Sequence, residues 1–139
     1  MFYPVEFDEG GDTVIAFLPD LPGVHDEGAT REEAMKRLLG AALAMIQSHI
    51  DDLEDIPDPS PAADRPTLTL PSQVWTKVLL YRAFREKGWR KADLARAIGS
   101  DQKAADRLLS ISHASRWDQV DQAFAALGMT FVPEAHRAA

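Results

Sequence analysis

Residues 91–109, KADLARAIGSDQKAADRLL, decide the fold of the second half of this chain. Two helices that cross at a short turn need a small residue at the crossing, a turn residue that tolerates positive φ, and apolar residues on both helices. The stretch supplies these at the required spacing with Leu94, Ala95, Ile98, Gly99 and Leu108. Two positions depart from the usual pattern: Ala105 is smaller than expected, and Arg90 stands where Ser or Thr would cap. The spacing predicts a helix-turn-helix unit; the alternative is a helical hairpin with no role at DNA.

The second helix of this unit, expected at residues 101–110 with Ser100 as its cap, would enter the major groove of DNA. Helical periodicity turns Ala105 and Leu108 inward. It leaves four side chains outward to contact bases, namely Gln102, Lys103, Asp106 and Arg107. Asp106 would accept from cytosine or orient Arg107. Four further basic side chains suit phosphates: Lys91, Arg90, Arg96 and Arg116. One such unit makes few base contacts, so we expect a homodimer or tetramer on an inverted-repeat operator.

Helical periodicity continues on both sides of this stretch. Apolar residues recur every three or four positions from Ser72, a suitable N-cap, to Gly88, and again from about Ser115 to Gly128. Residues 129–132 are expected to add a last short strand. Residues 71–132 are therefore predicted to form an all-α helix-turn-helix domain.

A proline-rich segment precedes this domain. Residues 54–66, EDIPDPSPAADRP, hold four of the nine prolines of the chain. Proline fixes φ and disfavours helix at the residue before it, which predicts an extended linker. We place the linker at the end of a first domain that covers residues 1–70.

The first domain has the pattern of a small antiparallel sheet with one helix, which makes the whole chain α+β. Alternating side chains predict a strand over residues 3–7, and the apolar run 13–18 predicts a second strand. The glycines of EGGD, residues 9–12, would supply positive φ for the hairpin turn between them. Further strands are expected near 24–26 and at 67–70. Thr30 and Glu33 form a capping box at the start of a helix that should end near residues 47–51.

Charge divides the chain in the same way. The net charge is −7, but residues 1–64 hold 15 acidic and 3 basic residues, and residues 65–139 hold 7 acidic and 12 basic residues. The halves therefore carry −12 and +5. An acidic half repels nucleic acid and attracts basic partners, whereas a basic half can bind phosphates. The alternative is two solvated faces that happen to differ.

The composition argues against several function classes. The chain has no Cys, which excludes disulfides, thiolate metal sites and a Cys nucleophile. His25 and His49 are isolated, the acidic residues lack metal-ligand spacing, and no phosphate-binding or nucleophile motif occurs. We therefore expect no enzyme activity, no cofactor and no metal. No apolar run is long enough to span a bilayer and the N-terminus is no secretory signal, so we expect a cytoplasmic protein.

The order of these features resembles the HicB-type antitoxins of bacterial type II toxin–antitoxin systems, in the subgroup with a C-terminal helix-turn-helix. The matching segments are Tyr3-Pro4-Val5, residues 19–23 and 28–34, Pro59-Ser60-Pro61, residues 78–80, Leu94-Ala95, Ile98-Gly99, Arg107-Leu108 and residues 113–115. The resemblance implies an N-terminal domain with a degraded RNase H-like fold that binds and neutralises a HicA-type toxin, which cleaves mRNA. It also implies a C-terminal domain that represses the operon by binding promoter DNA.

For toxin binding we expect the loop over residues 20–27, because loops on rigid scaffolds often carry binding. Its candidate contacts are Asp20, Pro22, His25, Asp26 and Glu27. A second interpretation of the chain stays open: a stand-alone helix-turn-helix regulator whose N-terminal domain binds a small molecule or only dimerises. A neighbouring gene for a short, strongly basic protein would favour the antitoxin.

Overall fold

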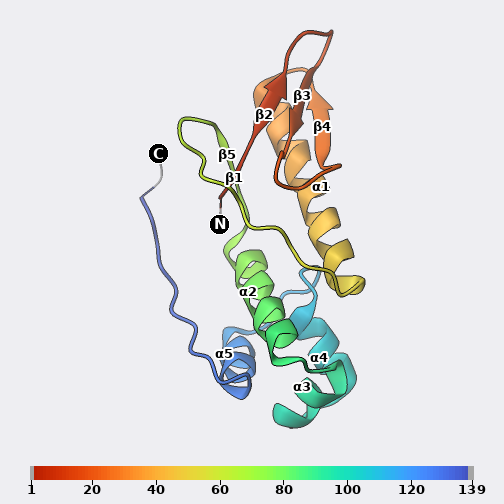
Figure 1. Ribbon diagram of the computed structural model, residues 1–139, viewed down its shortest axis with the longest axis vertical. Coiled ribbons are helices and arrows are strands. Elements are labelled where there is room, and N and C mark those ends of the chain that lie inside the picture. The colour runs from red at the N-terminus through yellow and green to blue at the C-terminus, as the bar shows by residue number, and fades with distance from the viewer. Residues whose placement is uncertain (1, 138–139) are drawn as a thin grey trace. The chain divides into compact units, whose positions relative to one another are not determined.

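The computed structural model describes residues 2–137 and has an α+β fold, as predicted (Figure 1). Antiparallel strands and one long helix come first, and shorter helices follow. The chain divides into two compact units after Thr76. No helix in the described part of the chain is both long and apolar enough to cross a membrane.

The first predicted strand serves two separate sheets. It is interrupted at Val5 into β1 (Phe2–Pro4) and β2 (Glu6–Asp8). β1 pairs antiparallel with β5 (Thr67–Thr69), the expected returning strand, while β2 pairs with β3 (Val14–Phe17). At the break, the Val5 amide donates to the carbonyl of Pro66 at 2.8 Å, and the Val5 side chain is buried. The prediction of one continuous strand was therefore wrong.

The three-stranded sheet runs in the order β2, β3 (Val14–Phe17) and β4 (His25–Gly28), with all neighbours antiparallel. The hairpin between β2 and β3 forms as expected, but not for the expected reason. Neither Gly10 nor Gly11 has positive φ; instead, the Asp8 carboxylate accepts from the Gly10 amide at 3.0 Å. Positive φ is needed in the next turn, at Gly23, where φ is +87°.

Helix α1 (Arg31–Asp51) covers one face of this sheet (Figure 1). Thr30 caps its start as predicted, because Thr30 Oγ1 accepts from the Glu33 amide at 3.2 Å. The Glu33 carboxylate also reaches back, but it accepts from the Ala29 amide at 3.2 Å and not from the Thr30 amide of a full capping box. The buried face consists of Ala34, Leu38, Ala42, Ile46 and Ile50. On the sheet, Ala16 and Gly28 are buried as well. The first core thus lies between α1 and the sheet.

The proline-rich segment 54–66 is tied to the first unit by hydrogen bonds. Tyr3 Oη donates to the Pro57 carbonyl at 2.6 Å. Asp20 Oδ2 accepts from both the amide and the hydroxyl of Ser60, at 2.8 and 3.0 Å. Ile56 is buried. The segment is therefore part of the first unit and is not a free linker.

The second unit consists of helices. The unit boundary falls inside α2 (Ser72–Lys87), which is followed by α3 (Lys91–Ala97), α4 (Gln102–Leu109) and α5 (Trp117–Ala126). The largest fully buried side chains that it contributes to the core include Tyr81, Phe84, Leu94 and Leu109. The strand predicted at residues 129–132 does not form. Phe131 instead stacks on Phe124, with ring centroids 5.3 Å apart.

Candidate functional site

The turn between α3 and α4 has the geometry that its sequence predicts. Gly99 has φ of +67°, in the left-handed region that costs other residues energy. The Gly99 amide donates to the Arg96 carbonyl at 3.1 Å, and the Ser100 amide donates to the Ala95 carbonyl at 2.9 Å. These two hydrogen bonds close the end of α3 and turn the chain sharply. Leu94 and Ala95 are buried beneath the turn, and α3 packs against α4.

The Asp93 carboxylate caps the start of α3, a role that the sequence analysis did not assign to it. Arg90 occupies the cap position, and its amide donates to the Asp93 carboxylate at 2.8 Å. This bond to the Arg90 amide, with the nearby Arg96 and Arg90 charges, lowers the pKa of Asp93 below its ordinary value of 3.8. The signal was in the sequence: an acidic residue three positions after the cap is the second half of a capping box.

Helix α4 presents the four predicted side chains outward. Gln102, Lys103, Asp106 and Arg107 are all exposed, and Ala105 and Leu108 are buried, as periodicity predicts. Its cap is Asp101, whose carboxylate accepts from the Ala104 amide at 2.8 Å, and not Ser100 as expected.

The predicted phosphate contacts differ in how far their charges are already paired. Lys91 forms an ion pair with Asp106, Arg96 pairs with Asp93 at 2.5 Å, and Arg116 lies 3.4 Å from Asp118. The structure thus gives Asp106 a lysine partner in place of the expected Arg107. Among the described residues, Arg90, Lys103 and Arg107 make no ion pair and remain available cations.

A buried lysine holds the end of α4. Lys77 of α2 is 1% exposed, and its Nζ donates to the carbonyls of Arg107 at 2.9 Å, Ser110 at 2.8 Å and His113 at 2.5 Å. These are carbonyls at and just beyond the C-terminus of α4, where a helix leaves acceptors unsatisfied and favours a cation. Burial lowers the pKa of Lys77 from 10.5 to about 8, which still leaves it charged at neutral pH.

The predicted toxin contacts do not all lie on one surface. Pro22 and His25 line a pocket at the β3–β4 turn. Glu27 is exposed two residues after His25 on β4, so both side chains lie on the same face of the sheet. Asp26 points to the opposite face, and its carboxylate accepts from the Glu27 amide at 2.8 Å. Asp20 is occupied in holding Ser60.

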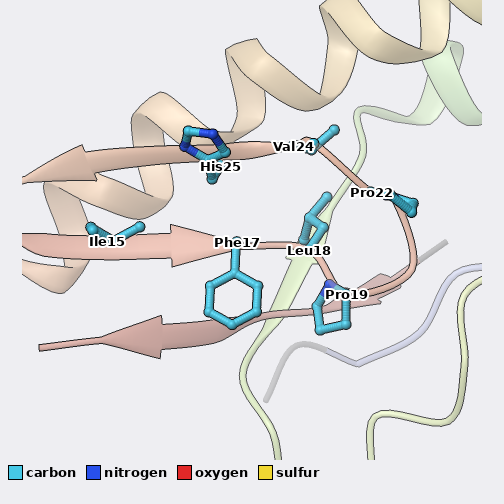
Figure 2. A pocket seen from close by; sticks show the side chains of 8 residues that line it. Ile15, Phe17, Leu18, Pro19, Pro22, Val24 and His25 are labelled. Atoms are coloured by element: carbon cyan, nitrogen blue, oxygen red, sulfur yellow. The ribbon is translucent and has the colours of Figure 1, made fainter.

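The pocket has a volume of about 350 Å³ and opens on the side of the sheet away from α1 (Figure 2). It is lined by Ile15, Phe17, Leu18, Pro19, Pro22, Gly23, Val24 and His25. The sequence did not single out Ile15 and Phe17, because the strand TVIAFL is apolar on both faces. Among the described residues, no group of three or more His, Cys, Asp or Glu side chains is placed to hold a metal ion.

The chain is similar to several known proteins, although no protein-family model matches it. Antitoxin HicB of Escherichia coli (strain K12) is 36% identical over 132 residues, which cover 92% of this chain and 94% of that protein. Antitoxin HicB 2 of Photorhabdus laumondii is 30% identical over 128 residues, or 92% and 91% of the two chains. Antitoxin HicB of Pseudomonas fluorescens is 31% identical over 128 residues, or 91% and 88% of the two chains. With both units inside these matches, the chain belongs to the HicB family of antitoxins.

Proposed function

We propose that this antitoxin binds and neutralises a HicA-type, mRNA-cleaving toxin through its first unit and represses its own operon through α3 and α4. The observation that carries the proposal is that relatives named as antitoxins align with both units of the chain. The protein would act in the cytoplasm by binding alone, as a homodimer or tetramer, with no catalytic residue, metal or cofactor of its own.

The outward face of α4 supports the DNA part of the proposal. Arg107 and Lys103 are exposed cations with no acidic partner among the described residues, so they are free to meet guanine or phosphate. Gln102 lies beside them and suits adenine. The buried Ala105 and Leu108 fix which side of the helix faces solvent. A recognition helix needs one side that packs against the protein and an opposite, exposed side that contacts bases.

The acidic first half of the chain supports the toxin part. Its charge of −12 over residues 1–64 attracts a basic protein and discourages nucleic acid from binding in its place. The two binding activities would therefore use surfaces of opposite charge on the two units.

The test is promoter footprinting with the full chain and with Arg107→Ala. We expect the wild type to protect an inverted repeat in its own promoter. Arg107→Ala should lose about 1–3 kcal/mol of operator affinity and relax the sequence preference at one position of each half-site.

Lys36→Ala is the matched control, because it removes one positive charge from α1 instead of α4. It should leave the footprint unchanged. If Arg107→Ala binds with the same affinity and sequence preference as the wild type, α4 is not the recognition helix.

A further inference from the structure

Within the first unit, as far as the structure describes it, α1 is the helix that packs on the three-stranded sheet, and it covers one face. Ala16 and Gly28 are buried on this face. Residue alternation along the strands then places two cross-strand rows on the opposite face. One row is Glu6, Phe17 and His25, and the next is Asp8, Ile15 and Glu27. We call these six residues the open face.

The centre of the open face is apolar. Ile15 is 36% exposed and Phe17 is half-buried, although both lie on the middle strand of the sheet. They form one wall of the pocket of about 350 Å³ that continues to Pro19 and Pro22 in the following turn (Figure 2). Exposed apolar side chains gathered around a hollow are typical of a surface that binds another molecule.

The pocket is poor in the groups that hold a small molecule. Such sites combine an apolar wall with several convergent polar side chains, and His25 is the one polar side chain in this lining. A protein partner with an apolar side chain fits the pocket better, because burial of that side chain needs no polar partner.

Carboxylates border this apolar centre on both edge strands. Glu6 lies 3.5 Å from Arg65. Asp8 and Glu27 form no ion pair among the described residues: Asp8 accepts from the Gly10 amide, and Glu27 accepts from Thr13 Oγ1 at 3.0 Å. Two carboxylates without basic partners, one on each side of Ile15, favour a partner that brings Lys or Arg to the edges of the same interface.

We propose that the open face is the surface that binds the toxin, a basic protein that inserts an apolar side chain into the pocket and sets basic residues against Asp8 and Glu27. The inference rests on the proposed function and assigns a surface to it. It moves the expected contact from the whole 20–27 loop to the sheet. Of the contacts expected from the sequence, His25 and Glu27 remain and Pro22 borders the surface, while Asp20 and Asp26 lie outside it.

The experiment measures the affinity of the full chain for the HicA-type toxin proposed as its partner. Variants on the open face are Ile15→Lys, Phe17→Ala and the charge reversals Asp8→Lys and Glu27→Lys. We expect the first two to weaken binding about thirtyfold or more, as loss of a central apolar contact does. Each reversal should weaken it about tenfold, more at low salt than at high salt.

Asp52→Lys is the matched control, since it reverses an exposed carboxylate just beyond α1 and away from the open face. It should bind like the wild type. Circular dichroism and thermal unfolding of every variant, measured in parallel, show whether the first unit, which carries the substitutions, is folded. If the wild type binds the toxin and none of the four substitutions weakens that binding, the assignment of the surface is wrong. If the wild type does not bind the toxin, the proposed function itself is wrong.

Sedimentation of the chain alone gives a separate outcome. If Ile15→Lys changes its oligomeric state and leaves toxin affinity unchanged, the open face joins copies of this chain and the proposal is wrong. An unchanged oligomeric state together with weakened toxin binding supports it.

Discussion

At the scale of single residues, the burial of Lys77 should make the stability of the protein depend on pH. Its side chain is 1% exposed and its ammonium is bound by three carbonyls, and burial lowers its pKa from 10.5 to about 8. The unfolded chain would keep the ordinary pKa. Between pH 8 and 10.5 the unfolded state therefore holds more protons than the folded state. The contribution of Lys77 to stability should rise with pH in this window and stay constant below it.

The size of this effect follows from the two pKa values, and it reaches about 3 kcal/mol at most, since one pKa unit corresponds to about 1.4 kcal/mol. The measurement is denaturant unfolding of the wild type and Lys77→Met from pH 7 to 10. The other titrating groups are common to both chains and cancel in the difference. We expect the free energy of unfolding of the wild type to rise relative to that of Lys77→Met as the pH rises. Free energies of unfolding that change equally with pH in the two chains would contradict this prediction.

Gly28 is required by its contact with the start of α1. A Cβ at this position would lie 2.6 Å from the Ala34 amide nitrogen and 2.8 Å from Glu33 Cβ. Backbone of a capped helix cannot move aside cheaply, so Gly28→Ala should lower the free energy of unfolding by about 1–3 kcal/mol.

Gly40→Ala is the matched control for this substitution. Gly40 lies within α1, and a Cβ added there would meet nothing within 4 Å outside the backbone of its own helix. Alanine is also the better helix former, so this substitution should raise stability by about 0.5–1 kcal/mol. Chemical denaturation of both variants checks the pair, and equal effects of the two substitutions would argue against close packing at Gly28.

At the scale of elements, the sequence predicts best where local rules decide the structure. Thr30 and Glu33 mark the start of α1, and Gly99 marks the turn of the helix-turn-helix, because caps and positive φ depend on near neighbours. The cap of α4 was misplaced by one residue, since Ser100 and Asp101 both carry a suitable oxygen.

Features that depend on distant partners were not predicted. The break at Val5 arises because β1 pairs with β5 and β2 with β3, and one segment cannot reveal two partners. Lys77 looks like an ordinary surface lysine until the carbonyls at the end of α4 surround it. The open face was missed because Ile15 and Phe17 sit in a strand whose alternation is hidden by apolar residues on both sides.

The ion pair between α3 and α4 leads to a prediction about the element that would read DNA. Asp106 pairs with Lys91 and so competes with phosphate for that lysine. Asp106→Asn should break the ion pair with Lys91 and remove a negative charge from the exposed side of α4. We expect tighter binding to all DNA sequences and a plot of log affinity against log salt that is steeper by about 1. Titrations at several salt concentrations measure it, and an unchanged slope would show that Lys91 does not meet phosphate.

At the scale of the whole molecule, the two units differ in charge and in chemistry. Residues 1–64 carry −12 and contain β1 to β4, α1 and most of the proline-rich segment, whereas residues 65–139 carry +5 and contain β5 and the helix-turn-helix. The difference in charge follows directly from the sequence, and relatives named as antitoxins align with 92% of the chain. Under the proposed function, substitutions in one unit should damage toxin binding and substitutions in the other should damage DNA binding.

The most direct test of the antitoxin function is growth of cells that express the HicA-type toxin proposed as its partner, with and without the full chain. We expect the toxin alone to arrest growth and co-expression of the wild-type chain to restore it. Arg107→Ala should restore growth equally well, because its defect lies on α4. Growth arrest that persists while the full chain accumulates in folded form would contradict the account.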